Sequence, residues 1–302
     1  MAASRQALSS AYMDCLARNI PEANVPKEVD LVLDAGGITS LRTHGVLLYL
    51  DALIRAGKTK VRRVSTTSAG SVVGIAFLLR GATSLDTHQL LCEVLKSVRR
   101  KGDLSLLMDF LRTNLVAHVG EEQLKELNGR LFVTYKAPSS GRSRIVSTYS
   151  SANDLMETVQ RAAHVPYLSD GGLFRKGKYC DGLTPTVFRD NRRPCLLVSP
   201  VQLFRWVDVF WASSPARAWA LEMEGATDAH EFFFQGRSRF CSYCNLGWSF
   251  AYMRMCVREM IALVVVAVLC VLDEGSKRSS IVACAFARLR RFVAFCVRTL
   301  AR

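Results

Sequence analysis

The residues with the clearest chemical potential lie in the stretch VSTTSAGS, residues 64–71. An apolar, strand-like run ends there in a cluster of hydroxyls, and Ser68 is followed at once by Ala69 and Gly70. A serine on a sharp strand-to-helix turn needs small neighbours, because the helix and the strand must approach closely. The first N–H groups of the helix then offer partial positive charge to a developing oxyanion. Since the other serines of the stretch lack a glycine two residues later, Ser68 is the candidate nucleophile.

Positioning this serine requires a strand before it and a helix after it, and the surrounding pattern predicts both. VDLVLDAGG (29–37) is typical of a buried strand that ends in a glycine turn, and a helix is expected over 41–56 with Ser40 as its N-cap. Further strands are expected at 60–67, 130–136, 144–150, 178–181 and 195–200, and further helices at 69–81, within 84–127 and at 152–163. Strands that alternate with helices predict an α/β fold with helices on both faces of a sheet.

Composition limits the class of partner. The chain has 302 residues, of which 50% are hydrophobic and 22% charged, so it is globular rather than disordered. Its formal net charge of +14 favours an acidic partner. The sequence has neither a paired Cys/His finger nor an aromatic-rich RNA-binding strand, so an anionic lipid surface is expected and nucleic acid is not. The absence of an apolar secretory signal and the ten scattered cysteines indicate reduced thiols in an intracellular protein.

Three segments in a fixed order carry a resemblance to a known family. A glycine pair stands in DAGGITSLRTHGVLLYL (34–50), the serine elbow follows at 64–71, and AAHVPYLSDGGLFRKGKYCDGLTPTVF (162–188) contains an Asp-Gly pair. In this order the chain resembles the patatin-like phospholipases, particularly their adiponutrin-type branch, over residues 29–235. The resemblance implies a three-layer α/β/α sandwich. It also implies a lipid acyl hydrolase, of the phospholipase A or acylglycerol lipase type, that cleaves carboxylic esters of glycerolipids.

The same resemblance implies roles for individual residues. Ser68 would be the nucleophile and Asp181 the general base, a dyad that works without histidine. The oxyanion hole would be formed by three backbone N–H groups, those of Gly36, Gly37 and Ala69. Two further glycines would complete the elbow and the Asp-Gly motif, namely Gly70 and Gly182. This mechanism requires no metal and no organic cofactor.

The motifs depart from the family pattern at their edges. Thr66 stands where the elbow normally has its first glycine, and Leu183 follows the Asp-Gly pair. The glycine turn reads AGGITS (35–40) instead of G-G-G-x-[RK]-G, so it lacks the basic residue, and Arg42 cannot be assumed to replace it. These departures leave a second hypothesis open. The chain would then be a catalytically weakened homologue that acts as a lipid-surface binding or interaction protein.

Histidine offers an alternative mechanism. His230 follows Asp181 in the chain and would satisfy the order of a Ser–acid–His triad, although packing on a helix is the more frequent role of such a residue. His164 stands in the run before VPY, which the resemblance places near the acyl site, and a structural role is expected for it too. The pair Cys241–Cys244 lacks the further ligands of a zinc site, and the basic run at 96–101 is expected to be a solvated helix end.

The C-terminal third differs in character from the rest. The expected division is a patatin-like domain over 29–205 and a helical extension over 206–302 that associates with a membrane from residue 248. MIALVVVAVLCVL (260–272) is uncharged but shorter than the roughly 20 residues that span a bilayer. A basic amphipathic segment follows at 276–302, which predicts an interfacial helix or the second arm of a membrane hairpin. A core helix with a solvated basic face is the alternative. The expected location is a membrane or lipid-droplet surface.

Overall fold

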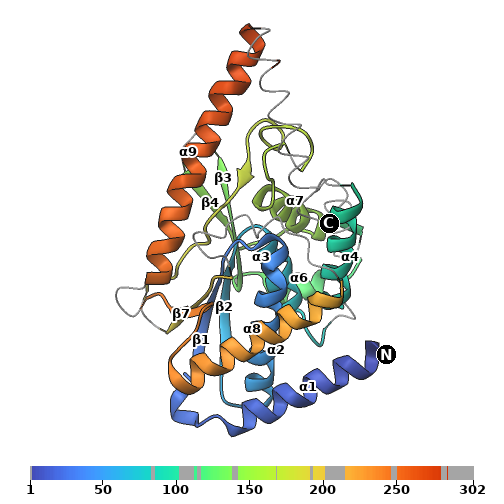
Figure 1. Cartoon of the computed structure of the whole chain (residues 1–302), viewed down its shortest axis with the longest axis vertical. Coiled ribbons are helices and arrows are strands. Elements are labelled where there is room, and N and C mark those ends of the chain that lie inside the picture. The colour runs from blue at the N-terminus through green and yellow to red at the C-terminus, as the bar shows by residue number, and fades with distance from the viewer. Residues whose placement is uncertain are drawn as a thin grey trace.

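The computed structural model describes residues 2–82, 86–101, 112–113, 117–137, 142–167, 169–190, 193–200, 215–245, 250–279 and 284. Figure 1 shows their arrangement: strands form a central sheet, helices pack against it, and one long helix stands along its side and projects beyond it. The basic segment predicted at 276–302 lies, beyond residue 279 and apart from Cys284, outside the described residues.

Helices and strands are mixed along the whole described chain. The helices are α1 (Ala2–Asn19), α2 (Ser40–Arg55), α3 (Ala69–Leu78), α4 (Thr87–Lys101), α6 (Glu121–Leu127), α7 (Ala152–Ala162), α8 (Pro215–Gln235) and α9 (Phe250–Arg278). The strands are β1 (Glu28–Leu33), β2 (Lys60–Thr66), β3 (Leu131–Ala137), β4 (Arg142–Val146), β5 (Cys180–Asp181), β6 (Cys195–Val198) and β7 (Cys241–Tyr243). Short 3-10 turns occupy Glu22–Asn24 and Gly37–Thr39.

The sheet is mostly parallel and has β1 near its centre. Its order is β4-β3-β2-β1-β6-β7, and β5 pairs with β3 off this path. The four inner strands run parallel, whereas β4, β5 and β7 pair antiparallel with their neighbours. The carboxyl ends of the parallel strands therefore meet at one edge of the sheet, where α/β proteins place their ligands. The predicted α/β class is confirmed at this level.

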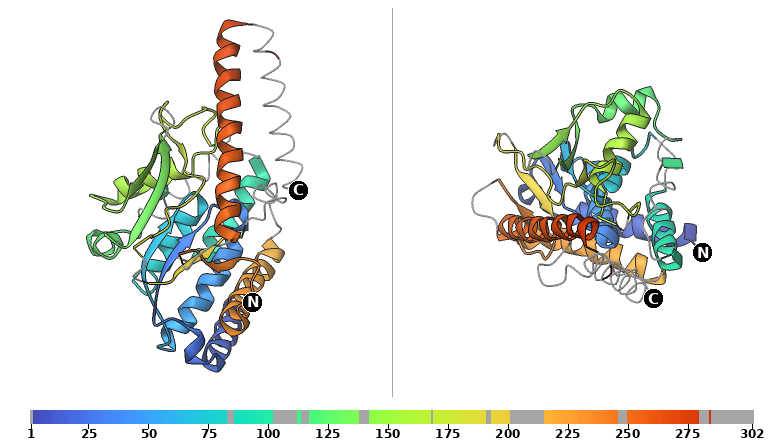
Figure 2. Two further views of the ribbon diagram at one scale, coloured as in Figure 1. Left: turned by 90° about the vertical axis from the view of Figure 1, so that its left-hand side faces the viewer. Right: turned by 90° about the horizontal axis from the view of Figure 1, so that it is seen from above.

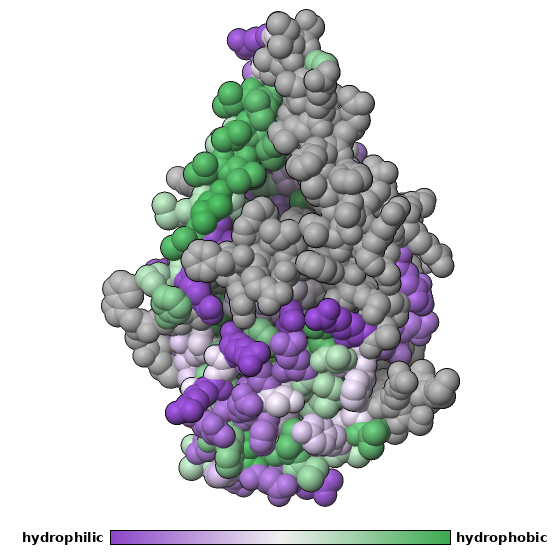
Figure 3. All heavy atoms as spheres, viewed as in Figure 1, coloured by the Kyte–Doolittle hydropathy of each residue, from purple (hydrophilic) through white to green (hydrophobic). Residues whose placement is uncertain are grey.

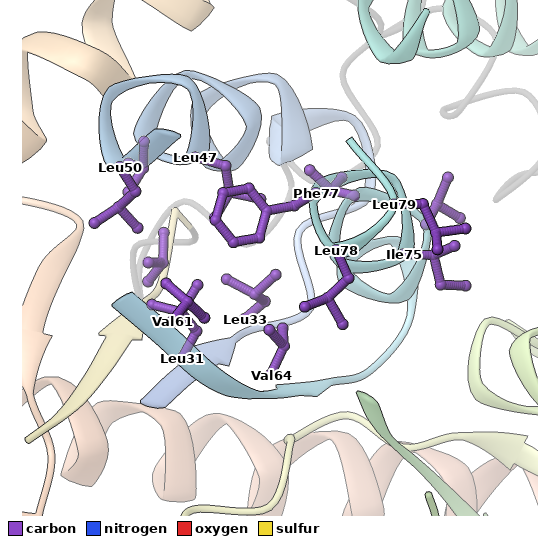
Figure 4. Packing of buried hydrophobic residues seen from close by; sticks show 14 of the residues in the cluster. Leu31, Leu33, Leu47, Leu50, Val61, Val64, Ile75, Phe77, Leu78 and Leu79 are labelled. Carbon is purple, nitrogen blue, oxygen red and sulfur yellow. The ribbon is translucent and has the colours of Figure 1, made fainter. Parts of the chain in front are cut away.

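The main core lies between the sheet and the layer formed by α1, α2, α3 and α8. Leu31 and Leu33 of β1 and Val64 of β2 project from the sheet toward α2 and α3, as Figure 4 shows. β1 alternates its side chains, so Val32 points to the other face and joins a smaller cluster that includes Met255 of α9. Both faces of β1 are therefore covered, which explains why the last three residues of the strand, Leu31 to Leu33, are all apolar.

The structure corrects two element predictions and fixes the start of a third element. Ser40 is the first residue of α2 rather than its N-cap, a position that Thr39 takes without a side-chain hydrogen bond. The strand expected at 144–150 begins and ends earlier, at Arg142–Val146, because Asn128 binds the backbone of Tyr149 and turns the chain away. The C-terminal apolar segment is part of one uninterrupted helix, α9, which starts ten residues before it.

Candidate functional site

Ser68 occupies a strained position between β2 and α3. Its backbone has φ 52° and ψ −140°, a left-handed conformation that costs a residue with a side chain on the order of 1–3 kcal/mol. α3 begins at the next residue, Ala69, so the serine stands at the helix N-terminus. The turn is tied down locally, since the N–H of Ser71 donates to the carbonyl of Ser68 at 3.0 Å. Backbone strain of this kind is what holds a nucleophile away from both flanking elements.

Glycines allow α3 to approach the sheet behind this turn. A Cβ on Gly70 would lie 3.0 Å from the carbonyl oxygens of Leu33 and Asp34 at the end of β1. A Cβ on Gly74, one turn further along α3, would lie 2.7 Å from the methyl carbon of Thr66. The threonine that replaces the expected glycine therefore fits, because Gly74 leaves the space that its methyl group needs.

The hydroxyl of Thr66 is equally well accommodated. It hydrogen-bonds to the hydroxyl of Ser71 at 3.1 Å and lies 3.3 Å from the carbonyl of Phe132 on β3. A buried hydroxyl with partners avoids the free-energy cost of an unsatisfied polar group. The elbow thus forms with threonine at this position.

Strand β3 brings Asp181 to the elbow. Thr66 of β2 pairs with Val133 of β3, so the parallel register continued by two residues places Ser68 level with Tyr135. Tyr135 is also paired with Asp181 of β5, and because β4 occupies the opposite edge of β3, β5 lies on the same edge of β3 as β2. The chain that follows β2 and the short strand β5 therefore meet along one edge of β3, which brings the candidate nucleophile and the candidate base together at the carboxyl edge of the sheet.

The turn after Asp181 is built tightly against β3. A Cβ on Gly182 would overlap the carbonyl of Thr134, so this position admits only glycine. The N–H of Leu183 donates to Oδ1 of Asp181 at 2.8 Å, and Leu183 itself has a positive φ of 62°. The backbone N–H of Asp181 donates to the carbonyl of His164 at 3.0 Å. The carboxylate is thereby held in one orientation.

One carbonyl joins the two loops. The oxygen of Ala162, the last residue of α7, accepts the N–H of Ser68 at 3.1 Å and the N–H of Gly182 at 3.4 Å. The last carbonyls of a helix have no partner within the helix, so they are free to bind other backbone groups. α7 therefore fixes the elbow and the Asp-Gly turn relative to each other.

The electrostatic state of Asp181 suits a base. Burial raises the pKa of its carboxyl to about 6, while a hydrogen bond with Ser68, the N–H of Leu183 and the charge of Arg258 act in the opposite direction. The carboxylate is therefore ionised at neutral pH but is more basic than an exposed aspartate. The same contact places the side chains of Ser68 and Asp181 within hydrogen-bonding reach.

Arg258 of α9 enters this region, and sequence patterns did not indicate it. Its guanidinium forms an ion pair with Oδ1 of Asp34, which is completely buried at the end of β1. The second carboxylate oxygen, Oδ2, accepts the hydroxyl of Ser199 at 2.6 Å, and Oδ1 also accepts the N–H of Ala35 at 2.8 Å. Asp34 thus anchors the start of the glycine turn, and Arg258 neutralises its charge.

The next residue of α9 contacts the other loop. Glu259 forms an ion pair with Lys136 of β3 and accepts the hydroxyl of Thr184 at 2.6 Å. Two adjacent residues of α9 therefore bind the start of the glycine turn, through Asp34, and the Asp-Gly turn, through Thr184. The signal that could have revealed them is the charged pair Arg-Glu immediately before an apolar helix segment, where charges are costly without partners.

The glycine turn lies beside the elbow, since its first residues follow the carbonyl of Asp34 that faces Gly70. Gly37 has φ 47°, a conformation that favours glycine, and starts a short 3-10 turn. The carbonyl of Gly36 accepts the N–H of Thr39 at 2.9 Å and its hydroxyl at 2.6 Å. Arg42 is turned away from the turn and pairs with Glu224 of α8 at 2.9 Å.

The two histidines occupy separate environments. His230 of α8 contacts the hydroxyl of Tyr49 at 3.0 Å and stacks on Phe234, so its ring is engaged in the helix layer. No histidine side chain is among the groups that contact Asp181 in the described part of the chain. His164 is buried, which lowers its pKa, and its carbonyl rather than its ring binds Asp181.

The remaining sequence candidates have simpler surroundings. Lys96 pairs with Glu93 at 2.6 Å, and the side chains at 97–101 lie outside the described residues. Cys241 is buried in β7, and the thiol of Cys244 donates to the carbonyl of Cys195. Among the residues that the structure describes, no group of three or more histidine, cysteine or acidic side chains is arranged to hold a metal ion.

Comparison of the sequence with protein-family models and with curated proteins finds no match. The geometry of the site is therefore the basis of the functional proposal.

Proposed function

We propose that this protein is a patatin-like lipid acyl hydrolase that cleaves carboxylic ester bonds of glycerolipids through Ser68 and Asp181. The observation that carries the proposal is the pairing of a strained serine at a helix N-terminus with a buried aspartate whose pKa is raised to about 6. A general base works best with a pKa near the working pH and within hydrogen-bonding reach of the proton that it takes. Both conditions support this pair.

In this mechanism Ser68 Oγ attacks the ester carbonyl while Asp181 takes the hydroxyl proton. The tetrahedral oxyanion is stabilised by the N–H of Ala69 at the start of α3 and by the N–H groups of Gly36 and Gly37. Collapse of the intermediate breaks the ester bond, and Asp181 returns its proton to the departing alcohol. Water activated by the same carboxylate then hydrolyses the acyl-enzyme and releases the fatty acid.

Helix α9 supports a lipid substrate and a membrane location. Tyr252–Arg278 is long and apolar enough to cross a membrane by length and composition, and only 6% of its most apolar window is buried. Beyond Glu259 the exposed apolar residues form a band along the helix, visible in Figure 3: Met260, Ile261, Leu263, Val264, Val265, Val268 and Val271. Figure 2 shows that this half of α9 projects past the sheet.

The first turns of α9 set the depth of this contact. Arg258 and Glu259 are bound to the protein, so insertion begins after them. The uncharged segment 260–272 has a length of about 20 Å at 1.5 Å per residue, less than the roughly 30 Å hydrocarbon core. Because Asp273 beyond this segment accepts a hydrogen bond from the hydroxyl of Tyr167, we infer that α9 lies along the lipid surface with its exposed apolar band in one leaflet and holds the site edge there.

A direct test uses the full chain with vesicles of phosphatidylcholine and phosphatidylglycerol and with a triacylglycerol emulsion. Wild type should release fatty acid from at least one substrate, and Ser68→Ala should abolish the release. Asp181→Asn should lower the rate by about a hundredfold or more. The matched control is His230→Ala, which should retain activity because its ring contacts only the helix layer.

The outcomes separate the rival functions. Loss of activity in His230→Ala together with an active Asp181→Asn would replace the dyad by a triad. If folded wild type releases no fatty acid in a Ser68-dependent way from any substrate but still binds vesicles, the protein is a lipid-surface binding homologue.

A further inference from the structure

A second group of reactive side chains lies outside the Ser68 site, where α2, α4 and α8 meet. Glu222 of α8 is buried, and its carboxylate is bound by Nδ1 of His88 on α4 at 2.8 Å and by Nδ1 of His44 on α2 at 2.7 Å. The other ring nitrogen of His88, Nε2, lies 3.5 Å from the sulfur of Cys92, one turn further along α4. A carboxylate, an imidazole and a thiol therefore stand in line, the order in which acid, base and nucleophile are arranged in cysteine-dependent sites.

The backbone around Glu222 is fixed by a close crossing of α2 and α8. A Cβ on Gly45 would overlap the carbonyl of Glu222, and a Cβ on Gly225 would overlap the carbonyl of Arg42. The neighbouring charges are already paired, since Arg42 contacts Glu224 at 2.9 Å. The carboxylate of Glu222 therefore has the two histidines, rather than Arg42, as its charged partners.

This carboxylate determines where the proton of His88 resides. An ionised carboxylate only accepts hydrogen bonds, so Nδ1 carries a hydrogen and Nε2 is left facing the sulfur. Burial by itself would raise the pKa of Glu222, but the hydrogen bonds from His44 and His88 outweigh it and lower the pKa. Contact with Cys92, followed by contact with Glu222, raises the pKa of His88 to about 10. Nε2 of His88 is therefore the nitrogen that faces the thiol of Cys92 and can exchange a proton with it.

We propose that Cys92 is a nucleophilic thiol that adds to α,β-unsaturated carbonyl compounds, with His88 carrying its proton and Glu222 positioning His88. In the reaction the sulfur forms a bond to the β-carbon, and the electron pair of the carbon–carbon double bond moves toward the carbonyl. The proton on Nε2 of His88 is then delivered to the α-carbon. No group leaves and no oxidant is needed, so the step is balanced by the thiol and the electrophile alone.

The surroundings favour an apolar electrophile that arrives from the solvent side of His88. The side chain of His88 is 39% exposed, whereas Cys92 is buried beside Leu91 and Leu90. The exposed imidazole is therefore the side from which an electrophile would approach the sulfur.

The experiment is labelling of the full chain with N-ethylmaleimide, an α,β-unsaturated carbonyl compound, followed by peptide mass spectrometry. The internal reference is the exposed Cys15 of α1. At pH 6.5 a thiol with a pKa of about 8.5 is only about 1% thiolate, so proton transfer to His88 leaves room for an acceleration approaching a hundredfold. We expect Cys92 to be labelled faster than Cys15, and His88→Gln and Glu222→Gln to slow the labelling of Cys92 strongly at pH 6.5 and little at pH 9.

Two controls separate chemistry from packing. Gln89→Ala changes an exposed neighbour on the same turn and should leave the rate of Cys92 unchanged. Thermal unfolding of each variant reports whether the fold is intact. The proposal is overturned if Cys92 in wild type is labelled no faster than Cys15 at pH 6.5. It is also overturned if a folded His88→Gln variant keeps the wild-type rate, since the cluster then serves only to pin α4 to α8.

Discussion

The methyl group of Thr66 occupies the space that Gly74 leaves open on α3. A Cβ at position 74 would lie only 2.7 Å from that methyl carbon and 3.3 Å from Leu33. The two residues therefore form one steric unit: glycine in the helix replaces glycine in the strand. Thr66 and Gly74 lie eight positions apart in the chain. The threonine adds a methyl group on β2 where the glycine omits a side chain on α3, so the elbow keeps its strained serine.

This exchange predicts the outcome of a double substitution. Gly74→Ala should destabilise the protein by about 1–3 kcal/mol through overpacking and should lower the activity of Ser68. Thr66→Ser removes the methyl group but keeps the hydroxyl that bonds to Ser71. Combined with Gly74→Ala it should recover most of the loss, as measured by urea unfolding. Additive effects of the two substitutions would contradict the steric unit.

The pH dependence of hydrolysis should report the ionisation of Asp181. Because the pKa of this carboxyl is raised to about 6, the rate should be nearly constant above pH 7 and should fall about tenfold per pH unit well below pH 6. Arg258→Gln should move this acid limb to higher pH, since it removes a positive charge that favours the carboxylate and leaves the charge of Asp34 unpaired. Arg258→Lys serves as the control and should keep the limb near its original position. An unchanged limb in the glutamine variant would exclude an electrostatic role for Arg258.

The free energy of unfolding should also depend on the ionisation of Asp181, and its contribution should fall as the pH rises. The folded-state pKa of Asp181 lies above its usual value of 3.8, so the folded protein binds this proton more tightly than the unfolded chain does. Wild type therefore loses stability as the pH rises from about 4 to about 6. Asp181→Asn has no proton to lose there, so it should be more stable than wild type at pH 7 by on the order of 3 kcal/mol and similar to it at pH 4. Unfolding by urea at both pH values measures the difference, and equal stability at pH 7 would show that the carboxylate is not desolvated.

Membrane binding should depend on the distal half of α9. Val264→Glu, Val268→Glu and Val271→Glu together place three charges on the exposed apolar band and should abolish co-flotation with vesicles. Ile145→Glu is the matched control, because it changes an equally exposed apolar residue on the edge strand β4. Arg258 and Glu259 are untouched, so hydrolysis of a short-chain soluble ester should persist. Vesicle binding by the triple variant would assign the membrane contact to another surface.

The parts of the site that sequence patterns predicted are those that depend on local backbone geometry. A serine followed by small residues at a strand end and an Asp-Gly pair each indicate a turn, and Ser68 and Asp181 do lie beside each other along one edge of β3. Ser40 was wrongly expected to cap α2 because a serine before a helix is a good cap in general, and here the turn at Thr39 starts the helix one residue earlier.

The parts that could not be predicted depend on distant segments. Arg258 lies 224 positions from Asp34, and a pattern of isolated charges cannot reveal which buried carboxylate they meet. The fit of Thr66 likewise depends on Gly74, which belongs to another element. A comparison of the motif alone therefore registers Thr66 as a mismatch and misses the glycine that accommodates it. Whether the site hydrolyses lipid depends on these compensations rather than on the motif letters.

The carbonyl of Ala162 gives the site a property that neither loop has alone. The elbow and the Asp-Gly turn are both hydrogen-bonded to this one oxygen. A small displacement of α7 is therefore expected to move Ser68 and Asp181 in the same direction. We therefore expect a shift of α7 to change the spacing of Ser68 and Asp181 less than it changes their positions. In the proposed hydrolase, this shared hydrogen-bond acceptor would keep the nucleophile and the base aligned while the rest of the helix layer moves.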